Sequence, residues 1–517
     1  MKFLSLHLVY FFFISSCIAQ GTVLNIKSYG AVGDGITVNT KAIQLAVDAC
    51  NKNGGGDVVI PPGIFVTGTI HLKSNINLYL QSGAVLEGST NLADYELFYA
   101  GAPYSSVHKG MLFTENAENI TISGYGQIDG NGDHFFELDK AKKLSAEDTK
   151  FTRQKENFRH VENEIGDGPI VPKERPYQMF VFSNCKRVTI KDIFITKAPF
   201  WCMHFADCDA VRLNGVRLWN NLLAPNADGV DITSCTNVLI EDCDIRAGDD
   251  AIAIVGYNHH FEIPGFKHLI HPCGNIIISS CNLQSYSSGI RIGYLDQNTV
   301  KNIHVNNVNI TNATRGIGIF VRDEGSLENI TFSNINIETH LRTGDWWGNG
   351  EPIHISAVRG KENVKLGQIK HVLFENIICR GENGMLVYGS DESIIEDVSF
   401  DHIRFQLSDS KLNEVAGGNI DLRGSSLEKS LFSRDIPGLL AAYVNGLLIN
   451  DFKLEWLNTR MPFFTNGIEL SHFTGVEIMN FDGSPSPVDP KAYRIYAEQG
   501  QGFKTDNNRG VLLQNVH

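Results

Sequence analysis

The chain has 517 residues, of which 42% are hydrophobic, 20% are charged and 49 are glycine. This composition is typical of a turn-rich globular protein and excludes a disordered or membrane-embedded chain. Acidic residues outnumber basic ones and give a formal net charge of -14, which argues against a nucleic-acid partner. An acidic ligand would therefore need a local cluster of basic side chains.

The N-terminus predicts a secretory signal peptide over residues 1–19. A lysine precedes an apolar core from Phe3 to Ile14, and small residues lead to an expected cleavage after Ala19. The alternative is a lipoprotein signal with Cys17 as the lipidated residue, because ISSC loosely resembles a lipobox. No later run approaches the roughly 20 apolar residues that span a bilayer. We expect a secreted or periplasmic protein, or a surface lipoprotein if Cys17 is modified.

A helix is expected near the start of the mature chain. Residues 39–56 carry Ala42, Ile43, Ala46 and Val47 at helical spacing, and glycines end the pattern. The first coil of a solenoid needs a cover, so this helix is predicted to form an N-terminal cap.

Three insertions are expected in the loops. Residues 130–176 are charged and show neither a helical nor a strand period, so this segment either overhangs a cleft or lies in solvent. Shorter insertions are expected at residues 256–274 and 338–350. Together they would narrow an open groove on the surface of the protein.

A repeat of about 25 residues dominates the rest of the chain. Runs of β-branched residues recur from VTIKDIFI at 188 to VSFDHIRF at 398, with Asn, Asp and Gly between them. No helical pattern separates the runs. We predict an all-β fold, a parallel β-helix that forms a single domain over residues 20–517.

The cysteines follow the same repeat. Cys185, Cys208, Cys235 and Cys273 each stand just before a β run, so most of the cysteines are interpreted as small buried hydrophobes that stack between coils. A disulfide between some pair is the alternative for a secreted protein.

A second set of short runs carries the candidate chemistry. It includes DGVDI at 228, DAIAI at 250, SGIRI at 288, RGIGI at 315 and EPIHI at 351. Strand alternation sends the apolar positions inward and the fourth positions outward, among them Asp231, Arg291 and His354. The first position of each run lies at the corner that leads into the strand.

Aspartates gather at two of these corners. Asp228 and Asp250 are equivalent in consecutive coils, so roughly 4.8 Å should separate their Cα atoms, and Asp249 joins them from the preceding corner. Crowded carboxylates raise at least one pKa, which suits general acid catalysis on a glycosidic oxygen while the others activate water. The alternative is a structural ladder in which each aspartate caps backbone amides.

The neighbours Asp249 and Asp250 pose a geometric problem. Ile252 and Ile254 point inward, so strict alternation sends Asp250 inward with them and Asp249 outward. A bend at residues 248–250 must break this alternation if both acids are to reach one cleft. Burial of Asp250 among the isoleucines would contradict a catalytic role for the pair.

These motifs resemble the polygalacturonase family of glycoside hydrolases, family 28. The resemblance rests on NAD at 226–228 followed by GDD at 248–250, on YGAVGDGITVNTKAIQLAVDAC near the N-terminus, and on ERPYQMFVFSNCKRVTI at 174–190. It spans nearly the whole mature chain. It implies a single-stranded right-handed parallel β-helix that hydrolyses pectic polymers with inversion.

The resemblance also implies roles for four residues. Asp249 matches the general acid of the family, Asp228 and Asp250 match the pair that activates water, and Asn226 matches the asparagine that begins the same motif, a candidate for substrate binding.

The chain departs from the family where cations bind a galacturonate carboxylate. The Gly-His-Gly motif is replaced by SSG at 287–289, and the Arg-Ile-Lys motif is replaced by GIF at 318–320. Arg291 and Arg315 stand nearby and could bind an acidic or sulfated sugar through paired hydrogen bonds. The alternative is that they are surface residues that balance the acidic ladder.

Four further residues are candidates for substrate binding. Trp346 and Trp347 lie in a polar, glycine-flanked loop, where indole rings can stack on sugars, with core packing as the alternative. Glu351 and His354 follow them in the column of short runs.

We therefore expect a monomeric, exo-acting, inverting glycoside hydrolase for a pectic or other acidic polysaccharide, with no cofactor, metal ion or nucleic-acid partner. One alternative is a polysaccharide lyase on the same fold, in which the carboxylates hold Ca²⁺ and an arginine is the base. The other is a non-catalytic carbohydrate-binding solenoid, which needs no clustered acids.

Overall fold

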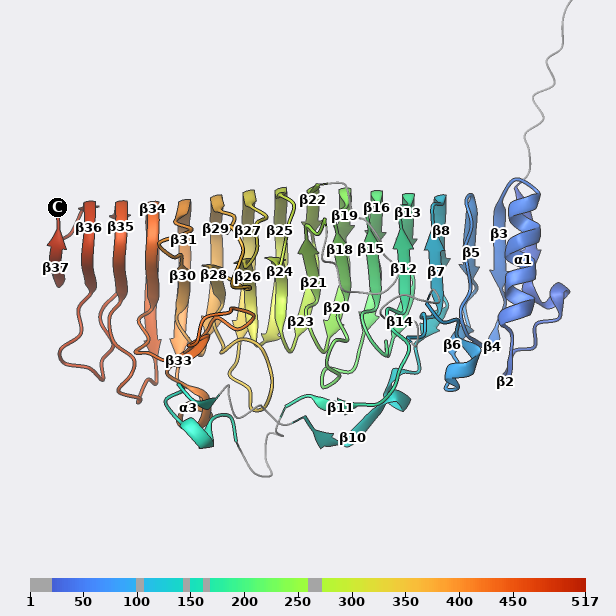
Figure 1. Cartoon of the computed structure of the whole chain (residues 1–517), viewed down its shortest axis with the longest axis horizontal. Coiled ribbons are helices and arrows are strands. Elements are labelled where there is room, and N and C mark those ends of the chain that lie inside the picture. The colour runs from blue at the N-terminus through green and yellow to red at the C-terminus, as the bar shows by residue number, and fades with distance from the viewer. Residues whose placement is uncertain (1–20, 99–106, 143–148, 161–167, 259–271) are drawn as a thin grey trace, which may run out of the picture.

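The computed structural model describes residues 21–98, 107–142, 149–160, 168–258 and 272–517. Nearly all strands of these ranges join one sheet of parallel strands that winds into a right-handed parallel β-helix (Figure 1). The predicted repeat and fold class are confirmed. The predicted signal peptide, with its Cys17, and most of the 256–274 insertion lie outside the described residues.

Each full coil contains three short strands separated by corners. The coil with the first candidate acid runs through β18 (Val230–Thr233), β19 (Thr236–Glu241) and β20 (Asp244–Ala247), and β21 (Ile252–Val255) starts the next coil. Val230 pairs with Ile252, so equivalent side chains stack at the spacing of parallel strands. Ser234 and Asp242 have positive φ at the corners, where Asn, Asp and Gly are the favoured residues.

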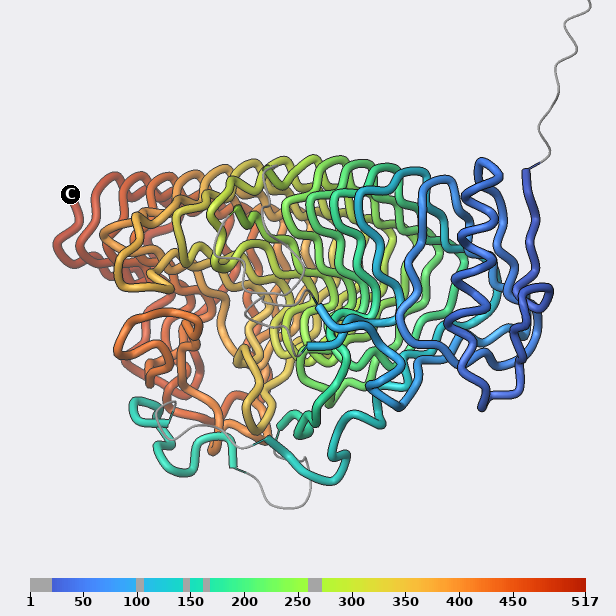
Figure 2. Tube along the Cα trace, turned by 45° about the vertical axis from the view of Figure 1, so that its right-hand side comes forward, coloured from blue at the N-terminus to red at the C-terminus, as the bar shows by residue number. Residues whose placement is uncertain are grey.

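The strands form columns along the solenoid (Figure 2). The column that carries the candidate site consists of β7 (Leu112–Glu115), β12 (Phe180–Ser183), β15 (Met203–Ala206), β18, β21, β24 (Ser288–Tyr294), β26 (Arg315–Val321), β28 (Ile353–Ala357) and β30 (Met385–Tyr388). A second column contains β8 (Glu118–Gly124), β13 (Lys186–Lys191), β16 (Asp209–Asn214), β19, β22 (Cys273–Ser279), β25 (Val300–Ala313), β27 (Leu327–Thr339), β29 (Ile369–Gly381) and β31 (Ile395–Ser408).

Stacks of like side chains fill the interior. The rings of Phe332, Phe374 and Phe400 lie parallel, with centroids 5.0 Å apart between successive coils. The nine cysteines of the described residues are all buried and free, which confirms their interpretation as small hydrophobes. No disulfide joins the cysteines within these ranges.

The expected N-terminal helix is present as α1 (Thr40–Lys52). Its buried face presents Ile43, Ala46 and Val47, and it contacts β1 (Thr22–Asn25) and β3 (Gly56–Ile60) at the N-terminal end of the solenoid (Figure 1). None of the helices in the described ranges has the length and apolar character that crossing a bilayer requires.

The described part of the 130–176 insertion folds back onto the solenoid. Its strands β10 (Phe136–Ala141) and β11 (Ile170–Pro172) pair antiparallel, and Phe158 packs against Leu412 and Leu431 of a C-terminal loop region. That region contains α3 (Asn413–Ala416), β32 (Asn419–Asp421) and β33 (Leu431–Ser433), which lie beside the insertion in Figure 1.

The aromatic stack makes a prediction about stability. Replacing the fully buried Phe374 with alanine removes the middle ring of the stack and leaves a cavity, which should cost about 3–5 kcal/mol. Ile378→Ala is the control on the same strand, because that side chain is 58% exposed and its loss should cost no more than about 0.5 kcal/mol. Scanning calorimetry measures both, and equal shifts in the unfolding temperature would contradict the packing described here.

Candidate active site

The neighbours Asp249 and Asp250 lie in a bend between β20 and β21. Residues 248–251 belong to neither strand, so strict alternation does not apply to them. Gly248 permits the bend because a Cβ at this position would lie 2.1 Å from the carbonyl oxygen of Ala224. The predicted break in alternation is confirmed.

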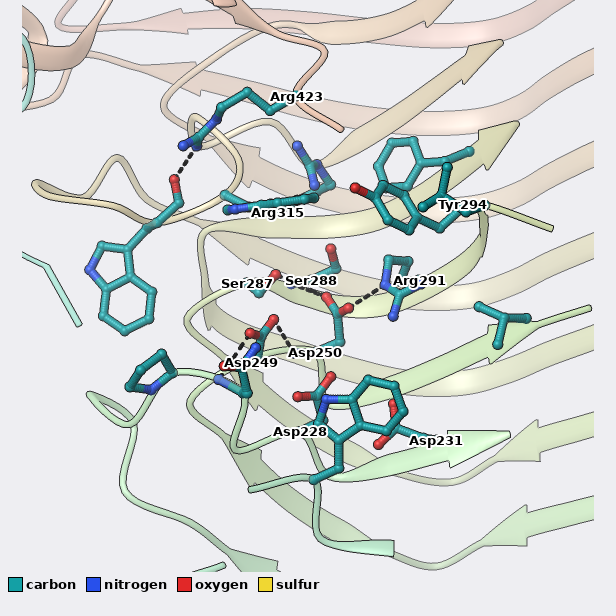
Figure 3. A pocket seen from close by; sticks show the side chains of 18 of the residues that line it. Asp228, Asp231, Asp249, Asp250, Ser287, Ser288, Arg291, Tyr294, Arg315 and Arg423 are labelled. Carbon is teal, nitrogen blue, oxygen red and sulfur yellow. Dashed lines mark hydrogen bonds and ion pairs between the residues drawn. The ribbon is translucent and has the colours of Figure 1, made fainter. Parts of the chain in front are cut away.

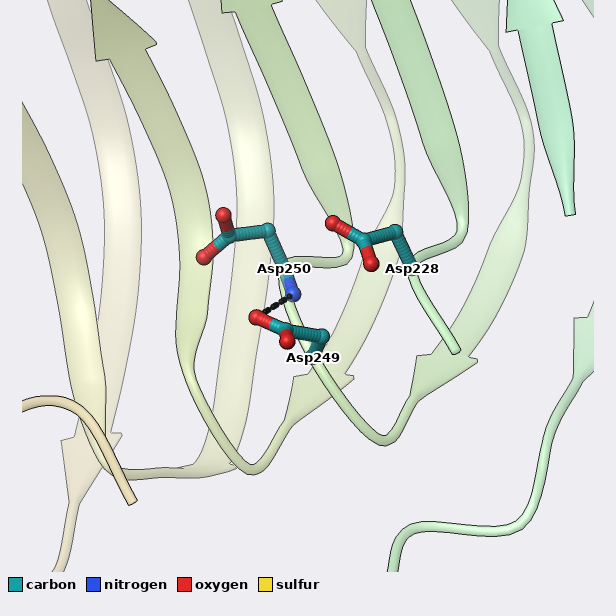
Figure 4. Close-up of side chains that lie close together, drawn as sticks. All are labelled: Asp228, Asp249 and Asp250. Atoms are coloured by element: carbon teal, nitrogen blue, oxygen red, sulfur yellow. Dashed lines mark hydrogen bonds between the residues drawn. The ribbon is translucent and has the colours of Figure 1, made fainter. Parts of the chain in front are cut away.

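The bend brings both acids to the same place as Asp228, which lies at the equivalent corner before β18 (Figure 4). One carboxylate oxygen from each of the three residues lies within 4.8 Å of the other two. Asp228 and Asp250 are only 3% and 4% exposed, and Asp249 is half-buried.

Asp250 does not lie among the isoleucines. Its Oδ1 accepts hydrogen bonds from the Ser287 hydroxyl (2.9 Å) and the Ser288 backbone N–H (3.0 Å), and its Oδ2 accepts one from Arg291. Both oxygens are therefore directed to the outer side of the sheet. Burial of Asp250 among the isoleucines, which would have contradicted a catalytic role for the pair, is not found.

The electrostatic environments of the three acids differ. Burial and the neighbouring carboxylate of Asp250 raise the pKa of Asp249 to about 6. Burial, followed by the charge of Asp249, raises the pKa of Asp228 well above its usual value. Burial also acts to raise the pKa of Asp250, but the charge and hydrogen bond of Arg291 outweigh it and lower this pKa. A group that keeps its proton thus lies beside one that loses it readily.

A cavity of about 440 Å³ opens above the acids (Figure 3). Asn226 lines it and donates its backbone N–H to Asp249 Oδ2 at 3.2 Å. Lys142 and Pro169 of the insertion also line it, so the insertion overhangs the site, as one of the two sequence alternatives predicted.

Arg291 and Arg315 both line the cavity, and neither is an isolated surface charge. Arg291 forms an ion pair with Asp250. Arg315 is 4% exposed and its Nε donates to Glu351 Oε1 at 2.8 Å. Arg315 is therefore not a surface residue, whereas Arg291 lines the cavity and also balances one of the clustered acids.

Three of the residues predicted to contact substrate are buried. Glu351 and His354 do not line this cavity; they are 4% and 1% exposed and lie behind Arg315, with which Glu351 pairs. Trp346 lines the cavity but is only 5% exposed, because its ring packs edge-on against Tyr286. Trp347 is 40% exposed and stays a candidate stacking platform.

Four other residues that line the cavity were not identified from the sequence. Asp231, 2% exposed, occupies the outward position of the run that begins at Asp228. Its position three residues after Asp228 could have identified it as a site residue from the sequence. Arg322 directly follows β26, the strand that contains the run at 315. Asp421 and Arg423 come from a segment with no repeat pattern and could not have been found from the sequence.

The loop that carries the tryptophans is held by the insertion. Arg159, 2% exposed, donates hydrogen bonds to the carbonyl oxygens of Gly344 (3.3 Å), Trp346 and Gly348 (2.6 Å), and to the side chain of Asn349. One buried guanidinium thus fixes the wall of the cavity above β26.

The fold and site define a parallel β-helix whose clustered acids are suited to the cleavage of glycosidic bonds. A family model described as glycosyl hydrolases family 28 matches residues 50–344, and the chain belongs to this family.

The matches to two curated relatives span less than half of the length of each relative. The chain is 31% identical over 252 residues to an exo-poly-alpha-D-galacturonosidase of Dickeya chrysanthemi, and this match covers 44% of the chain and 41% of the relative. It is 28% identical over 250 residues to a probable polygalacturonase of Vitis vinifera, which covers 46% and 45%. The solved family 28 exopolygalacturonase of Yersinia enterocolitica has a TM-score of 0.63 at 18% identity, over 90% of this chain and 80% of its own, and it shares the fold.

The contacts of Arg159 predict how the cavity wall can be loosened. Arg159→Gln removes several of the donors that hold residues 344–349, so trypsin should cleave after Arg342 faster than in the unaltered protein. Lys155→Gln, an exposed change in the same insertion, is the control and should leave the cleavage rate unchanged. Mass spectrometry of the fragments over time measures both, and equal rates for the two variants would show that Arg159 does not hold the loop.

Proposed function

We propose that the protein hydrolyses glycosidic bonds in a pectic or other acidic polysaccharide by general acid and base catalysis. The single observation that carries this proposal is the cluster in which carboxylate oxygens of Asp228, Asp249 and Asp250 lie within 4.8 Å of one another while Arg291 pairs with Asp250. In this cluster the pKa of Asp249 is raised to about 6 and the pKa of Asp250 is lowered. Adjacent acids whose environments separate their pKa values are suited to acid and base roles. Membership of family 28 supports the same reaction class.

In the proposed reaction Asp249 donates its proton to the glycosidic oxygen as the bond to the anomeric carbon breaks. Asp250, which is ionised, accepts a proton from a water molecule as the hydroxide portion adds to that carbon, and Asp228 helps to orient the water. One water is added across the bond, and the proton on Asp250 returns to Asp249 through solvent before the next cycle.

Inversion of configuration is part of the proposal. The closest carboxylate oxygens lie within 4.8 Å, which is shorter than the carboxyl separation of about 6.5–9.5 Å usual in inverting enzymes, and this spacing alone would suit a retaining enzyme. Two features oppose direct attack by a carboxylate. Asp250 is engaged at both oxygens, and the raised pKa of Asp228, due mainly to burial, favours its neutral form, which is a weak nucleophile.

An exo mode and an extracellular location complete the proposal. The wall formed by Lys142 and Pro169 of the insertion and by Trp346 and Trp347 of the loop that the insertion holds restricts the cavity, which favours binding of a chain end. The predicted signal over residues 1–19 supports export, and the proposed enzyme acts as a monomer without a cofactor.

The lyase alternative is less well supported. It needs an arginine that can accept a proton, but the pKa of Arg291 is raised, because the charge and hydrogen bond of Asp250 outweigh the opposite effect of burial. A guanidinium with this pairing keeps its proton at neutral pH. A binding solenoid, the other alternative, gives no reason to bury clustered acids at a free-energy cost.

Removal of the proposed acid gives the first test. Asp249→Asn keeps the shape of the side chain but cannot supply the proton, so kcat on pectic oligosaccharides should fall by about 10²–10⁴-fold. Asp242→Asn changes an exposed aspartate of the same coil and should retain full activity. Measurement of released reducing ends decides, and an active Asp249→Asn enzyme would refute the mechanism.

The pKa shifts predict the pH profile of kcat/KM. Asp249 must be protonated, so activity should fall as the pH rises through about 6. Asp250 must be ionised, so activity should fall on the acid side only below the usual aspartate range, because its pKa is lowered. Arg291→Gln removes the cause of that lowering and should move the acid limb to higher pH. A profile with an optimum above neutrality would contradict these assignments.

A further inference from the structure

A second cavity lies on the same face of the solenoid, toward its C-terminal end. Its volume of about 510 Å³ is within the range of about 300–1,000 Å³ that is usual for ligand sites. Its lining includes Arg153, Arg434, Glu469, Lys491, Tyr493 and Tyr496, and we call it the C-terminal cavity. It shares no lining residue with the cavity above the acids.

The strand ladder gives the position of the C-terminal cavity relative to the acids. Glu469 on β35 (Ile468–Met479) pairs with Tyr496 on β36 (Ile495–Thr505), near the C-terminal end of the solenoid in Figure 1. Successive pairs between coils lead from Ala253, beside the acids, through Arg291, Gly318, His354, Leu386 and Leu440 to Glu469. Six strand spacings, about 29 Å, therefore separate the two coils.

The hairpin of β32 and β33 borders both cavities. Asp421 of β32 lines the cavity above the acids, and Ser433 of β33 lines the C-terminal cavity. Arg153 brings the 130–176 insertion to the C-terminal cavity as well. Both sites therefore open on the face of the solenoid that the insertion and the C-terminal loop region cover in part.

Two tyrosine rings form one side of the C-terminal cavity. The ring centroids of Tyr493 and Tyr496 lie 6.2 Å apart, with the planes inclined by 33°, and Tyr493 is 38% exposed. The backbone N–H of Tyr493 donates to Asn466 Oδ1 at 2.8 Å, and the Tyr496 hydroxyl donates to Glu498 at 2.8 Å. Rings that are held in place and partly exposed can pack against the apolar face of a sugar.

Most charged side chains of the C-terminal cavity pair with one another. Arg434 forms an ion pair with Glu469, and Arg153 forms one with Asp435 at 2.9 Å. Lys491 is exposed and has no carboxylate partner among the described residues. Its ammonium group is therefore available to an anionic group of a ligand.

This lining favours a carbohydrate over a simple anion. The carboxylates of Asp435, Glu469 and Asp489 also face the cavity, and they would repel a small anion. Sugar hydroxyls both donate and accept hydrogen bonds, so they can bind beside carboxylates and cations alike. An acidic sugar can in addition pair its carboxylate with Lys491.

We propose that the C-terminal cavity is a second binding site that anchors a segment of an acidic polysaccharide, with sugar rings against Tyr493 and Tyr496 and a sugar carboxylate on Lys491. The choice of ligand rests on the proposed function. A polymer anchored there has a raised effective concentration at the acids about 29 Å away, whereas a short oligosaccharide cannot reach both sites.

Binding of polygalacturonate tests the site without turnover. Asp249→Asn is the parent protein, because it should leave the polymer intact, and affinity electrophoresis in gels that contain the polymer measures Kd. Adding Tyr493→Ala should raise Kd about three- to tenfold through the lost ring contact. Adding Lys491→Gln should raise Kd at low salt and have less effect at high salt.

The matched control for the tyrosine is Tyr125→Ala. Tyr125 is 73% exposed and lines neither cavity, so its loss should leave Kd unchanged. Circular dichroism and the unfolding temperature verify that each variant is folded. Folded Tyr493 and Lys491 variants that bind the polymer as tightly as the parent would overturn the inference and leave the hydrolase assignment intact.

Kinetics of the single Tyr493→Ala variant separate anchoring from catalysis. KM for the polymer should rise about three- to tenfold, while kcat/KM for a pectic trisaccharide should equal that of the unaltered enzyme. An equal loss on both substrates would overturn the inference. Polymer binding that depends on Tyr493 in a protein that hydrolyses neither substrate would instead contradict the proposed function and support the second site.

Discussion

The parallel ladder of the solenoid is the constraint on which the site depends. Adjacent coils place equivalent corners about 4.8 Å apart, so aspartates at matching corners must share one small volume. Asp228 and Asp250 are forced together in this way, and the close approach of Gly248 to the neighbouring coil turns Asp249 toward them. The repulsion among these acids is offset by Arg291 and by protons, and that balance gives the neighbouring acids their different pKa values.

The same ladder arranges polar side chains along the axis of the cavity. Each coil contributes its own outward side chains, so the change from Asp231 to Arg315 needs only different residues in successive repeats. Loops outside the ladder form the remaining walls of the cavity. Arg423, from the C-terminal loop region, lines the cavity, and Arg159, from the insertion, holds the loop that forms its wall.

The sequence predicted what local patterns determine. The repeat, the N-terminal helix and the bend at Gly248 follow from alternation and residue type within a few positions. Alternation also placed His354 on the outer face of the sheet, but it carries no information about what covers that face, so the burial of His354 and of its neighbour Glu351 was missed. Arg423 lines the cavity and Arg159 holds the loop that forms its wall, both from segments far away in the sequence, and only the folded chain brings them together.

The stereochemistry of the first product tests the central claim most directly. Proton NMR during the first minutes of hydrolysis reports the anomeric configuration of the released sugar before mutarotation. Water activated by Asp250 attacks from the face opposite the leaving group, so the account predicts a product with inverted configuration. Retained configuration would contradict it and would assign direct nucleophilic attack to one of the clustered carboxylates. An unsaturated product would contradict hydrolysis altogether.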